Sequence, residues 1–258
     1  MSTLGGSLSI LKNPDILFYI FKGVIFTLIL SVVAVGLGLV IGSILALVRN
    51  YSRSDSSNPL KRFLAAFFRT LSITYIEIFR NTPLLLWIFV CLVFFPFPEA
   101  MAHRMFGLTS VEVKLLFKAA AALILFTSSV IAEIVRGGLN SVPSGQFEAG
   151  HSQGFNTVQI MLYIILPQAF RNIIPTLLSQ IITTIKDSSY LANIAVIELM
   201  SRVKTLLNSA YNYNGTGTVN VSDVFVLFGF AALIYFIINF TLSIAVRRIK
   251  NKPKVRVV

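Results

Sequence analysis

The chain has 258 residues, of which 55% are hydrophobic and only 12% are charged. A soluble domain carries about 25% charged residues, so this composition leaves too few charges to cover a water-facing surface and excludes a soluble globule, a disordered chain and a fibrous protein. The formal net charge of +12 at pH 7 favours basic loops held at the cytoplasmic face of a membrane, beside anionic lipid, over nucleic-acid binding.

The first apolar segment, Gly23–Val48, contains no charged residue and is flanked by Lys22 and Arg49. A helix needs about 20 apolar residues to cross the hydrocarbon layer of a bilayer, so this segment predicts a first membrane span. Within it, Gly38 and Gly42 form a GxxxG pattern. Glycines at this spacing share one helix face and permit another helix to approach closely, so we expect this face to be a packing surface.

The next part of the chain begins with a polar loop and continues with an apolar segment. Residues 49–62 are rich in serine and basic residues, and the positive-inside rule places them in the cytoplasm. Residues 63–98 are apolar apart from three charged side chains, Arg69, Glu77 and Arg80. They could form two spans joined by a tight turn at residues 81–83, or one long broken helix whose first part lies at the cytoplasmic surface. Pro83 kinks a helix, which favours the broken helix.

A third span is predicted over residues 113–136, and the segment after it, 137–166, is too polar to cross a membrane. We expect that segment to form a short helix, a break at Gly154 and a second helix that is ended by Pro167. Such an element would lie at the membrane face and present a protruding surface to a partner protein. Its expected apolar side is formed by Phe155, Val158, Ile160, Met161 and Ile164.

Two more spans and a basic tail complete the predicted architecture. The tail carries six basic residues and no acidic one, so it is expected in the cytoplasm, and five spans then place the N-terminus outside. The sequence predicts an all-α integral membrane protein with one transmembrane domain over residues 1–258. The predicted spans are 23–48, 76–97, 113–136, 168–192 and 222–246, with a cytoplasmic loop at 137–166 and the tail at 247–258.

Four short sequence boxes, in order, resemble those of one transporter family. Glu148–Pro167 has the pattern EAxxxxG-x9-IxLP, which resembles the EAA loop of ABC-importer permeases. Ile78–Leu85 resembles the FRGTPLL box of polar amino-acid permeases. Ala132–Leu139, with the Val-Pro and Gly-Gln pairs that follow it, resembles their EivRgGi run, and Lys186–Ser189 resembles their KdTSL box. A single EAA match would be weak, but four boxes in this order are specific.

The sequence departs from the family pattern at three positions. Gly150 replaces the third alanine of the EAA loop, Asn81 replaces the glycine of the FRGTP box, and Ser188 replaces the threonine of the KDTS box. Ser188 keeps the hydroxyl group. None of the three changes the family to which the chain is similar.

The resemblance implies the permease subunit of a polar amino-acid ABC importer of the histidine, glutamine, glutamate and arginine permease family, in a bacterial inner or plasma membrane. The implied partners are a dimer of ABC ATPase subunits, a second permease copy or a paralogue, an extracytoplasmic solute-binding protein, an amino-acid substrate and membrane lipid. The sequence has no GxxxxGK[ST] phosphate loop, so we expect no enzymatic activity and no cofactor in this chain, with ATP bound by the partner. One cysteine and two histidines far apart predict no metal site.

The resemblance assigns coupling to the ATPase to the EAA segment, where Gly154 would provide a sharp turn and Glu148 would lie near a helix start that favours a carboxylate. An alternative is that both residues only shape the loop. The predicted coupling residues are Glu148, Ala149, Gly154, Phe155, Leu166 and Pro167.

Charged side chains inside a membrane are costly and mark candidate substrate sites. A zwitterionic amino acid needs an acceptor for its ammonium group and a donor for its carboxylate. Asp187 suits the first role, and Arg80 or Lys186 suits the second. The predicted substrate-binding residues are Asp187, Ser188, Lys186, Arg80, Glu77 and Glu198.

Structural roles for several of these charges remain equally open at this point. Glu77 lies three residues before Arg80 on one helix face, so the two could pair with each other, as could the neighbours Lys186 and Asp187. Glu133 and Arg136 show the same spacing and are interpreted as structural. Glu198 could be a ligand or a gate near the outer loop.

The rival functions are an ion-gradient-driven secondary transporter of small solutes and a membrane enzyme. The first is typically built from inverted repeats, which the sequence does not show, and it leaves the EAA segment unexplained. The second needs a catalytic cluster at the bilayer surface. The amino acid carried, and the choice between a homodimer and a heterodimer, are not determined by the sequence.

Overall fold

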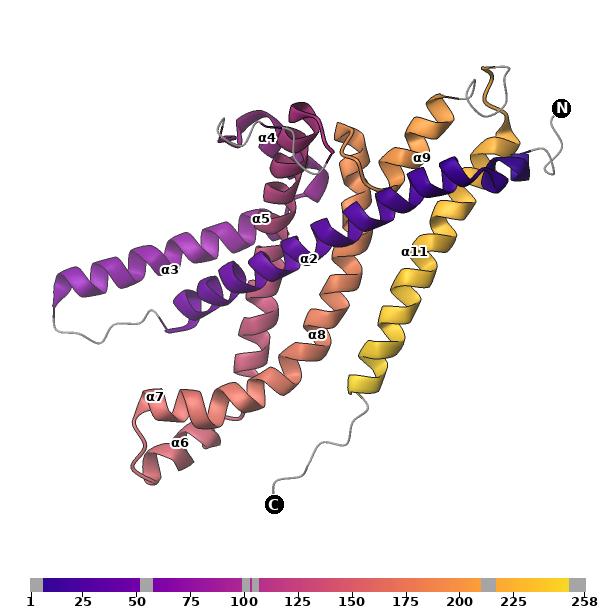
Figure 1. Ribbon diagram of the computed structural model, residues 1–258. Coiled ribbons are helices and arrows are strands. Elements are labelled where there is room, and N and C mark those ends of the chain that lie inside the picture. The colour runs from indigo at the N-terminus through magenta and orange to yellow at the C-terminus, as the bar shows by residue number, and fades with distance from the viewer. Residues whose placement is uncertain (1–6, 52–57, 99–102, 104–106, 210–216, 251–258) are drawn as a thin grey trace. The chain divides into compact units, whose positions relative to one another are not determined.

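The computed structural model describes residues 7–51, 58–98, 103, 107–209 and 217–250, and this part of the chain is helical without strands (Figure 1). The longer helices are α2 (Pro14–Tyr51), α3 (Pro59–Arg80), α5 (Ser110–Asn140), α8 (Leu166–Asp187) and α11 (Val221–Lys250). The shorter ones are α4 (Leu84–Phe94), α6 (Gly145–Ser152), α7 (Thr157–Ile160) and α9 (Leu199–Asn208). Short segments of other helix types are the 3-10 helix η1 (Ser9–Lys12), the π-helical η3 (Met161–Ile165) and the 3-10 helix η4 (Ser188–Ile194).

Within the described residues, four helical stretches are long and apolar enough to cross a membrane, at 14–50, 110–140, 157–208 and 221–248. The pair α3 and α4 passes the same test together and would give a fifth. This agrees with the predicted all-α membrane protein of about five spans. The last part of the expected basic tail, residues 251–258, lies outside the described residues, as do residues 52–57 of the polar loop.

The helix break between α3 and α4 lies at residues 81–83, where Pro83 predicted it. At the break, two side chains donate to carbonyls of α3 in place of the backbone amides that would continue the helix. The Asn81 Nδ2 atom donates to the carbonyl of Glu77 at 2.8 Å, and the Thr82 hydroxyl donates to the carbonyl of Ile78 at 2.6 Å. The end of α3 is therefore capped by its own next two residues.

The prediction that Pro167 ends the second helix of the 137–166 segment is wrong. The chain passes from α7 through η3 directly into α8, and Pro167 lies in the first turn of α8. Proline has no amide hydrogen, so it removes one backbone donor from this continuous helical stretch. The i→i+5 pattern of η3 just before it opens the helix locally.

One compact unit of the chain comprises Val35–Pro83, Ile124–Ile181 and Ile244–Val258. A Cβ atom on Gly42 of α2 would lie 2.6 Å from the Ser128 carbonyl oxygen and 2.9 Å from the Ala132 nitrogen of α5, so the close packing predicted for the GxxxG face is confirmed. The buried core of this unit is formed by Val35, Ala46, Ile76, Ile131, Ala132, Val135, Leu139, Val142, Ile160, Ile165, Ala169 and Ile173.

The other unit comprises Met1–Ala34, Leu84–Leu123 and Ile182–Ser243. It contains the first half of α2, the helices α4, α9 and most of α11. One buried core of this unit joins η1, α2, α9 and α11. Its members are Ile10, Ile16, Ile20, Val24, Leu199, Val203, Leu207, Leu227 and Ala231.

Candidate functional site

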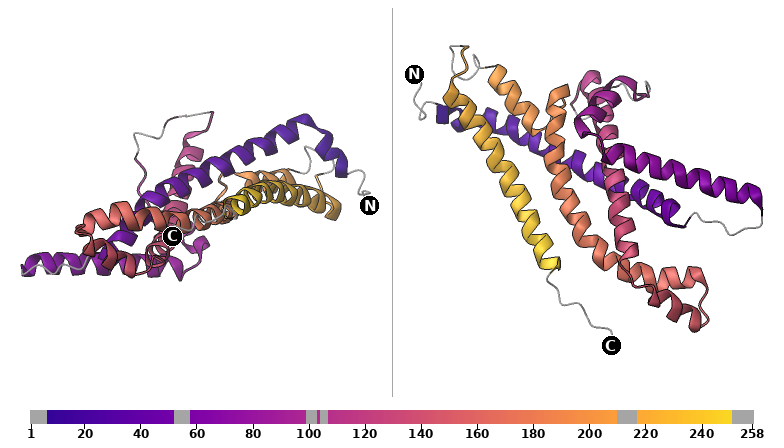
Figure 2. Two further views of the ribbon diagram at one scale, coloured as in Figure 1. Left: turned by 90° about the horizontal axis from the view of Figure 1, so that it is seen from below. Right: turned by 180° about the vertical axis from the view of Figure 1, so that it is seen from behind.

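The α6–α7 element, residues 145–160, presents an exposed edge that is positioned by its own turn. Figures 1 and 2 show the two short helices lying beside each other. Gly154 between them adopts a left-handed backbone with φ of 82°, a conformation that costs a residue with a side chain about 1–2 kcal/mol. Asn156 then starts α7 with a capping box to Gln159, with both bonds at 2.9 Å. The break at Gly154 was predicted.

The outer edge of α6 is free for a partner. Glu148, Ala149, His151 and Ser152 are exposed. Within this edge the Ser152 hydroxyl donates to the Glu148 carbonyl at 2.9 Å, which is a local bond of the helix. A short helix whose polar face is exposed, and whose other side is anchored, is suited to a groove on another protein.

The inner side of α6 is anchored through Gly150, which is buried. A Cβ atom on Gly150 would lie 2.7 Å from Cγ1 of Ile160 and 3.2 Å from Cδ1 of Ile164. The departure from the third alanine of the EAA pattern therefore fits the isoleucine that packs on it. The expected apolar side is split in the structure, because Ile160 is buried whereas Phe155 and Val158 are 37% and 66% exposed.

The start of α8 contacts α6 and the segment that joins α5 to α6. Gln168 Nε2 donates to Gln146 Oε1 at 3.1 Å, and Asn172 Nδ2 donates to the Ser141 hydroxyl at 2.8 Å. Of the two predicted coupling residues here, Leu166 packs against the core that contains Ile160, and Pro167 is exposed.

A cluster of charges joins α2, α3 and α5 around Glu133, whose side chain is only 14% exposed. Arg136 donates to Glu133 Oε2 at 2.8 Å, Arg80 Nη1 lies 3.5 Å from the same atom, and Arg49 contacts Oε1. Glu77 lies 3.6 Å from Arg49. The structural pairing predicted for Glu133 and Arg136 is confirmed.

The sequence did not predict Arg49 as a member of this cluster. It predicted that Arg80 could pair with Glu77 on the same helix. The structure pairs Arg80 with Glu133 and Glu77 with Arg49, across helices. A signal was present, since Arg49 and Glu133 both lie near the predicted inner ends of their spans. The choice among several acids and bases at that level needs the packing of the helices.

The KDSS box lies where α8 passes into η4. Lys186 is exposed, Asp187 is half-buried and Ser188 is fully buried. The Ser188 hydroxyl donates to the Ile185 carbonyl at 2.8 Å. Together, the three side chains offer a carboxylate, an ammonium group and a hydroxyl group at one helix end.

Glu198 is fully buried in the same unit of the chain as the KDSS box. It is the N-cap of α9, where Oε1 accepts from the Ser201 amide at 2.5 Å and Oε2 accepts from the Met200 amide at 2.9 Å. The Tyr235 hydroxyl of α11 donates to Oε2 at 3.2 Å. The other predicted substrate residues, Glu77 and Arg80, belong to the unit that comprises Val35–Pro83, Ile124–Ile181 and Ile244–Val258.

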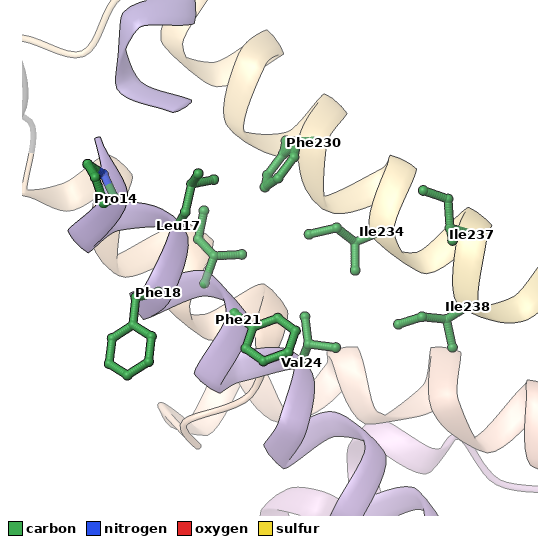
Figure 3. A pocket seen from close by; sticks show the side chains of 10 residues that line it. Pro14, Leu17, Phe18, Phe21, Val24, Phe230, Ile234, Ile237 and Ile238 are labelled. Atoms are coloured by element: carbon green, nitrogen blue, oxygen red, sulfur yellow. The ribbon is translucent and has the colours of Figure 1, made fainter. Parts of the chain in front are cut away.

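A hollow of about 680 Å³ lies between α2 and α11 and is lined by apolar side chains. Figure 3 shows Phe230 and Ile234 of α11 projecting toward Leu17 and Phe21 of α2. This lining offers no donor or acceptor for an ammonium or carboxylate group, so it does not suit a polar amino acid. Among the described residues, no group of three or more His, Cys, Asp or Glu side chains could hold a metal ion.

Residues 59–255 match a protein family described as the binding-protein-dependent transport system inner membrane component. The chain belongs to this family. The permease is therefore a multi-pass membrane protein, and permeases of ABC importers are non-catalytic subunits that work with a separate ATPase and a binding protein.

Three relatives of the permease carry names of glutamine or cystine permeases. The permease is 35% identical over 244 residues to the "Probable glutamine ABC transporter permease protein GlnM" of Bacillus subtilis (strain 168), which covers 93% of this chain and 97% of that protein. It is 38% identical over 177 residues to the "Probable glutamine ABC transporter permease protein GlnP" of the same organism, covering 68% and 72%. It is 32% identical over 233 residues to the "L-cystine transport system permease protein TcyB" from that organism, covering 89% and 84%.

Solved structures share the fold. A chain described as an amino acid ABC transporter with histidines superposes with a TM-score of 0.71 at 26% identity, covering 94% of the permease and 96% of that chain. An inward-facing MetNI methionine ABC transporter gives 0.64 at 19% identity, covering 92% and 99%, and shows the fold alone. The permease thus has the type I ABC importer fold.

Proposed function

We propose that this permease forms the translocation pathway of an ATP-driven importer for a polar amino acid. In this proposal, a second permease copy or a paralogue completes the pathway, and the two ATPase subunits dock on the α6 helices of the two permease subunits. A solute-binding protein delivers the amino acid from outside. The observation that carries the proposal is the exposed edge of α6, which is anchored to the helices of its unit through Gly150. The glutamine permeases among its relatives make glutamine the first amino acid to test.

The proposed coupling uses the packing of α6 on α7 and η3. When the ATPase closes, a push on Glu148 and Ala149 reaches Ile160 and Ile164 through the contact at Gly150. Ile160 shares one buried core with residues of α2, α3, α5 and α8. Because packed cores transmit displacement with little compression, this element would move the helices of its unit as one body.

The proposed substrate chemistry centres on the KDSS box. The Asp187 carboxylate would accept from the amino acid's ammonium group, the Lys186 ammonium group would donate to its carboxylate, and Ser188 would supply a hydroxyl group. The sequence offered Arg80 as the alternative donor, and within its own unit Arg80 Nη1 lies 3.5 Å from Glu133 Oε2.

The test is uptake by a reconstituted complex. The tagged permease is co-expressed with a candidate ATPase and binding protein, purified, and placed in proteoliposomes that are loaded with ATP. A panel of labelled amino acids beginning with L-glutamine is then supplied outside with the binding protein. We expect ATP-dependent uptake of one or a few polar amino acids.

Variants of α6 test the coupling. Ala149→Arg places a bulky charge on the exposed edge, and we expect it to abolish co-purification of the ATPase and ATP-dependent uptake. Val221→Arg adds the same side chain at a position of α11 that is 72% exposed, and it should leave both intact. Uptake by the permease alone without ATP would contradict the proposal and favour an ion-gradient-driven transporter.

A further inference from the structure

The buried carboxylate of Glu198 is fully engaged by protein donors. Its three partners are the amides of Ser201 and Met200 and the hydroxyl of Tyr235, at 2.5, 2.9 and 3.2 Å. The two amides belong to the first turn of α9, where a negative charge is stabilised by the helix dipole. A carboxylate with no exposed surface and these partners is a poor ligand for a passing amino acid, because binding would require the existing bonds to break.

Neighbouring residues of α9 fix this helix against α2. The Leu199 amide donates to the Thr27 hydroxyl at 3.1 Å, and the contact is so close that a Cβ atom on Gly23 would lie 2.9 Å from the Leu199 Cα atom. One turn further along α9, Arg202 donates to the Tyr19 carbonyl at 3.2 Å, and its guanidinium lies 4.3 Å from the centre of the Tyr19 ring. The start of α9 therefore cannot shift without breaking two polar contacts with α2.

Tyr235 connects this clamp with the KDSS box. Its hydroxyl donates to Glu198, and it also neighbours the side chains of Thr27 and Ser188. Ser188 is the residue next to Asp187. The chain between Ser188 and Glu198 is compact, since η4 is followed by Ala195 in the left-handed conformation at φ 55° and by a bond from the Val196 amide to the Leu191 carbonyl at 3.4 Å.

We infer that Glu198 is a positioning residue, which acts through Tyr235 to hold the KDSS box in the geometry that binds the amino acid. This inference rests on the proposed function, because it assigns the KDSS box to the substrate. It replaces the ligand role that the sequence suggested for Glu198. Tyr235 becomes a second positioning residue that the sequence did not indicate.

Two conservative variants test the inference in the permease–ATPase complex. Glu198→Gln keeps the size of the side chain but replaces one acceptor oxygen with an amide donor, and Tyr235→Phe removes one hydroxyl and keeps the ring. The matched control is Thr241→Val, which removes an exposed hydroxyl from the same helix, where it donates to the Ile237 carbonyl at 2.7 Å. The probe is labelled L-glutamine, followed by the amino acid with the highest wild-type uptake if that differs.

Two quantities are measured for each variant. The first is the amount of assembled complex, by size-exclusion chromatography. The second is the dissociation constant of the labelled amino acid from the purified complex without the binding protein. We expect Tyr235→Phe and Glu198→Gln to raise the dissociation constant roughly two- to tenfold, as loss of one hydrogen bond does, while Thr241→Val leaves it unchanged.

The outcomes separate the inference from the function on which it rests. If the assembled variants bind the amino acid as tightly as the wild type, or if their only defect is a lower amount of complex, Glu198 has a structural role alone and the inference is overturned. If the wild-type complex neither binds nor imports any amino acid of the panel, the proposed function itself fails.

Discussion

At the scale of single residues, the structure depends on glycines that have no room for a side chain. Gly42 faces the backbone of α5, with the Ser128 carbonyl 2.6 Å from the position of an added Cβ atom, whereas an added Cβ atom on Gly36 of the same helix would meet nothing within 4 Å. In lipid, close backbone approach replaces much of the hydrophobic driving force between helices. Gly42 is therefore a structural requirement and Gly36 is not.

Gly42→Ala is expected to destabilise the permease by about 1–3 kcal/mol, because backbone cannot yield as a flexible side chain can. Thermal unfolding in detergent measures the effect as a lower midpoint. Gly36→Ala is the matched control and should leave the midpoint unchanged or slightly higher. Equal midpoints for the two variants would show that α2 can separate from α5 at no cost.

The carboxylate of Glu133 is shared by three arginines. Glu133→Gln would leave these cations facing one another with no anion between them. We expect this substitution to lower the free energy of unfolding by roughly 1–3 kcal/mol, which lies between the values for surface and buried ion pairs. The control is Glu112→Gln at the start of the same helix, where the amide oxygen can still accept from the Thr109 amide. If the thermal midpoint fell equally in both variants, the cluster around Glu133 would have no special stabilising role.

At the scale of elements, the α6–α7 turn depends on one backbone conformation. Gly154 has φ of 82°, and Gly145 at the start of α6 has open space around its Cα atom and no such constraint. The direction of α6 relative to α7 follows from this turn. Any change of that direction would displace the exposed edge of α6 while leaving its residues in place.

Gly154→Ala is expected to add about 1–2 kcal/mol of strain to this turn, and therefore to lower both uptake and the ATP hydrolysis that the loaded binding protein stimulates. The purified complex in proteoliposomes provides both measurements. Gly145→Ala should reduce neither. If ATP hydrolysis stayed normal in Gly154→Ala while uptake fell, the turn would matter for the pathway and not for the contact with the ATPase.

At the scale of the whole molecule, the proposed orientation places α6 in the cytoplasm and the start of α11 outside. The single cysteine, Cys91, is buried in α4, so a Cys91→Ala background gives a chain without thiols. Single cysteines can then be placed at exposed positions on either side. Ser152 of α6 and Val219, which lies two residues before α11, are both exposed.

In intact cells, a membrane-impermeant maleimide should label Val219→Cys and leave Ser152→Cys unlabelled, because the reagent reaches only the outer face. Permeabilised cells should show labelling of both, which controls for reactivity. The reverse pattern would invert the orientation and remove α6 from the side on which ATP is present.

The sequence by itself determined the class of the protein, because so few charges force a chain into lipid, and apolar stretches of spanning length then locate helices. It also located the turn at Gly154 and the break at residues 81–83, since glycine and proline act through their own backbone. The order of four short boxes identified the family. These features are all local in sequence.

Only the tertiary structure decided which charges meet and which are engaged elsewhere. The partner of Glu133 on α2 is Arg49, 84 positions away, and the donors to Glu198 include Tyr235 of α11, 37 positions away. Helical spacing indicates which residues share a face of one helix, but it does not select the helix that will pack there. That selection depends on the close fit at residues such as Gly23 and Gly42, where the backbone or side chain of a distant segment occupies the space of a missing Cβ atom.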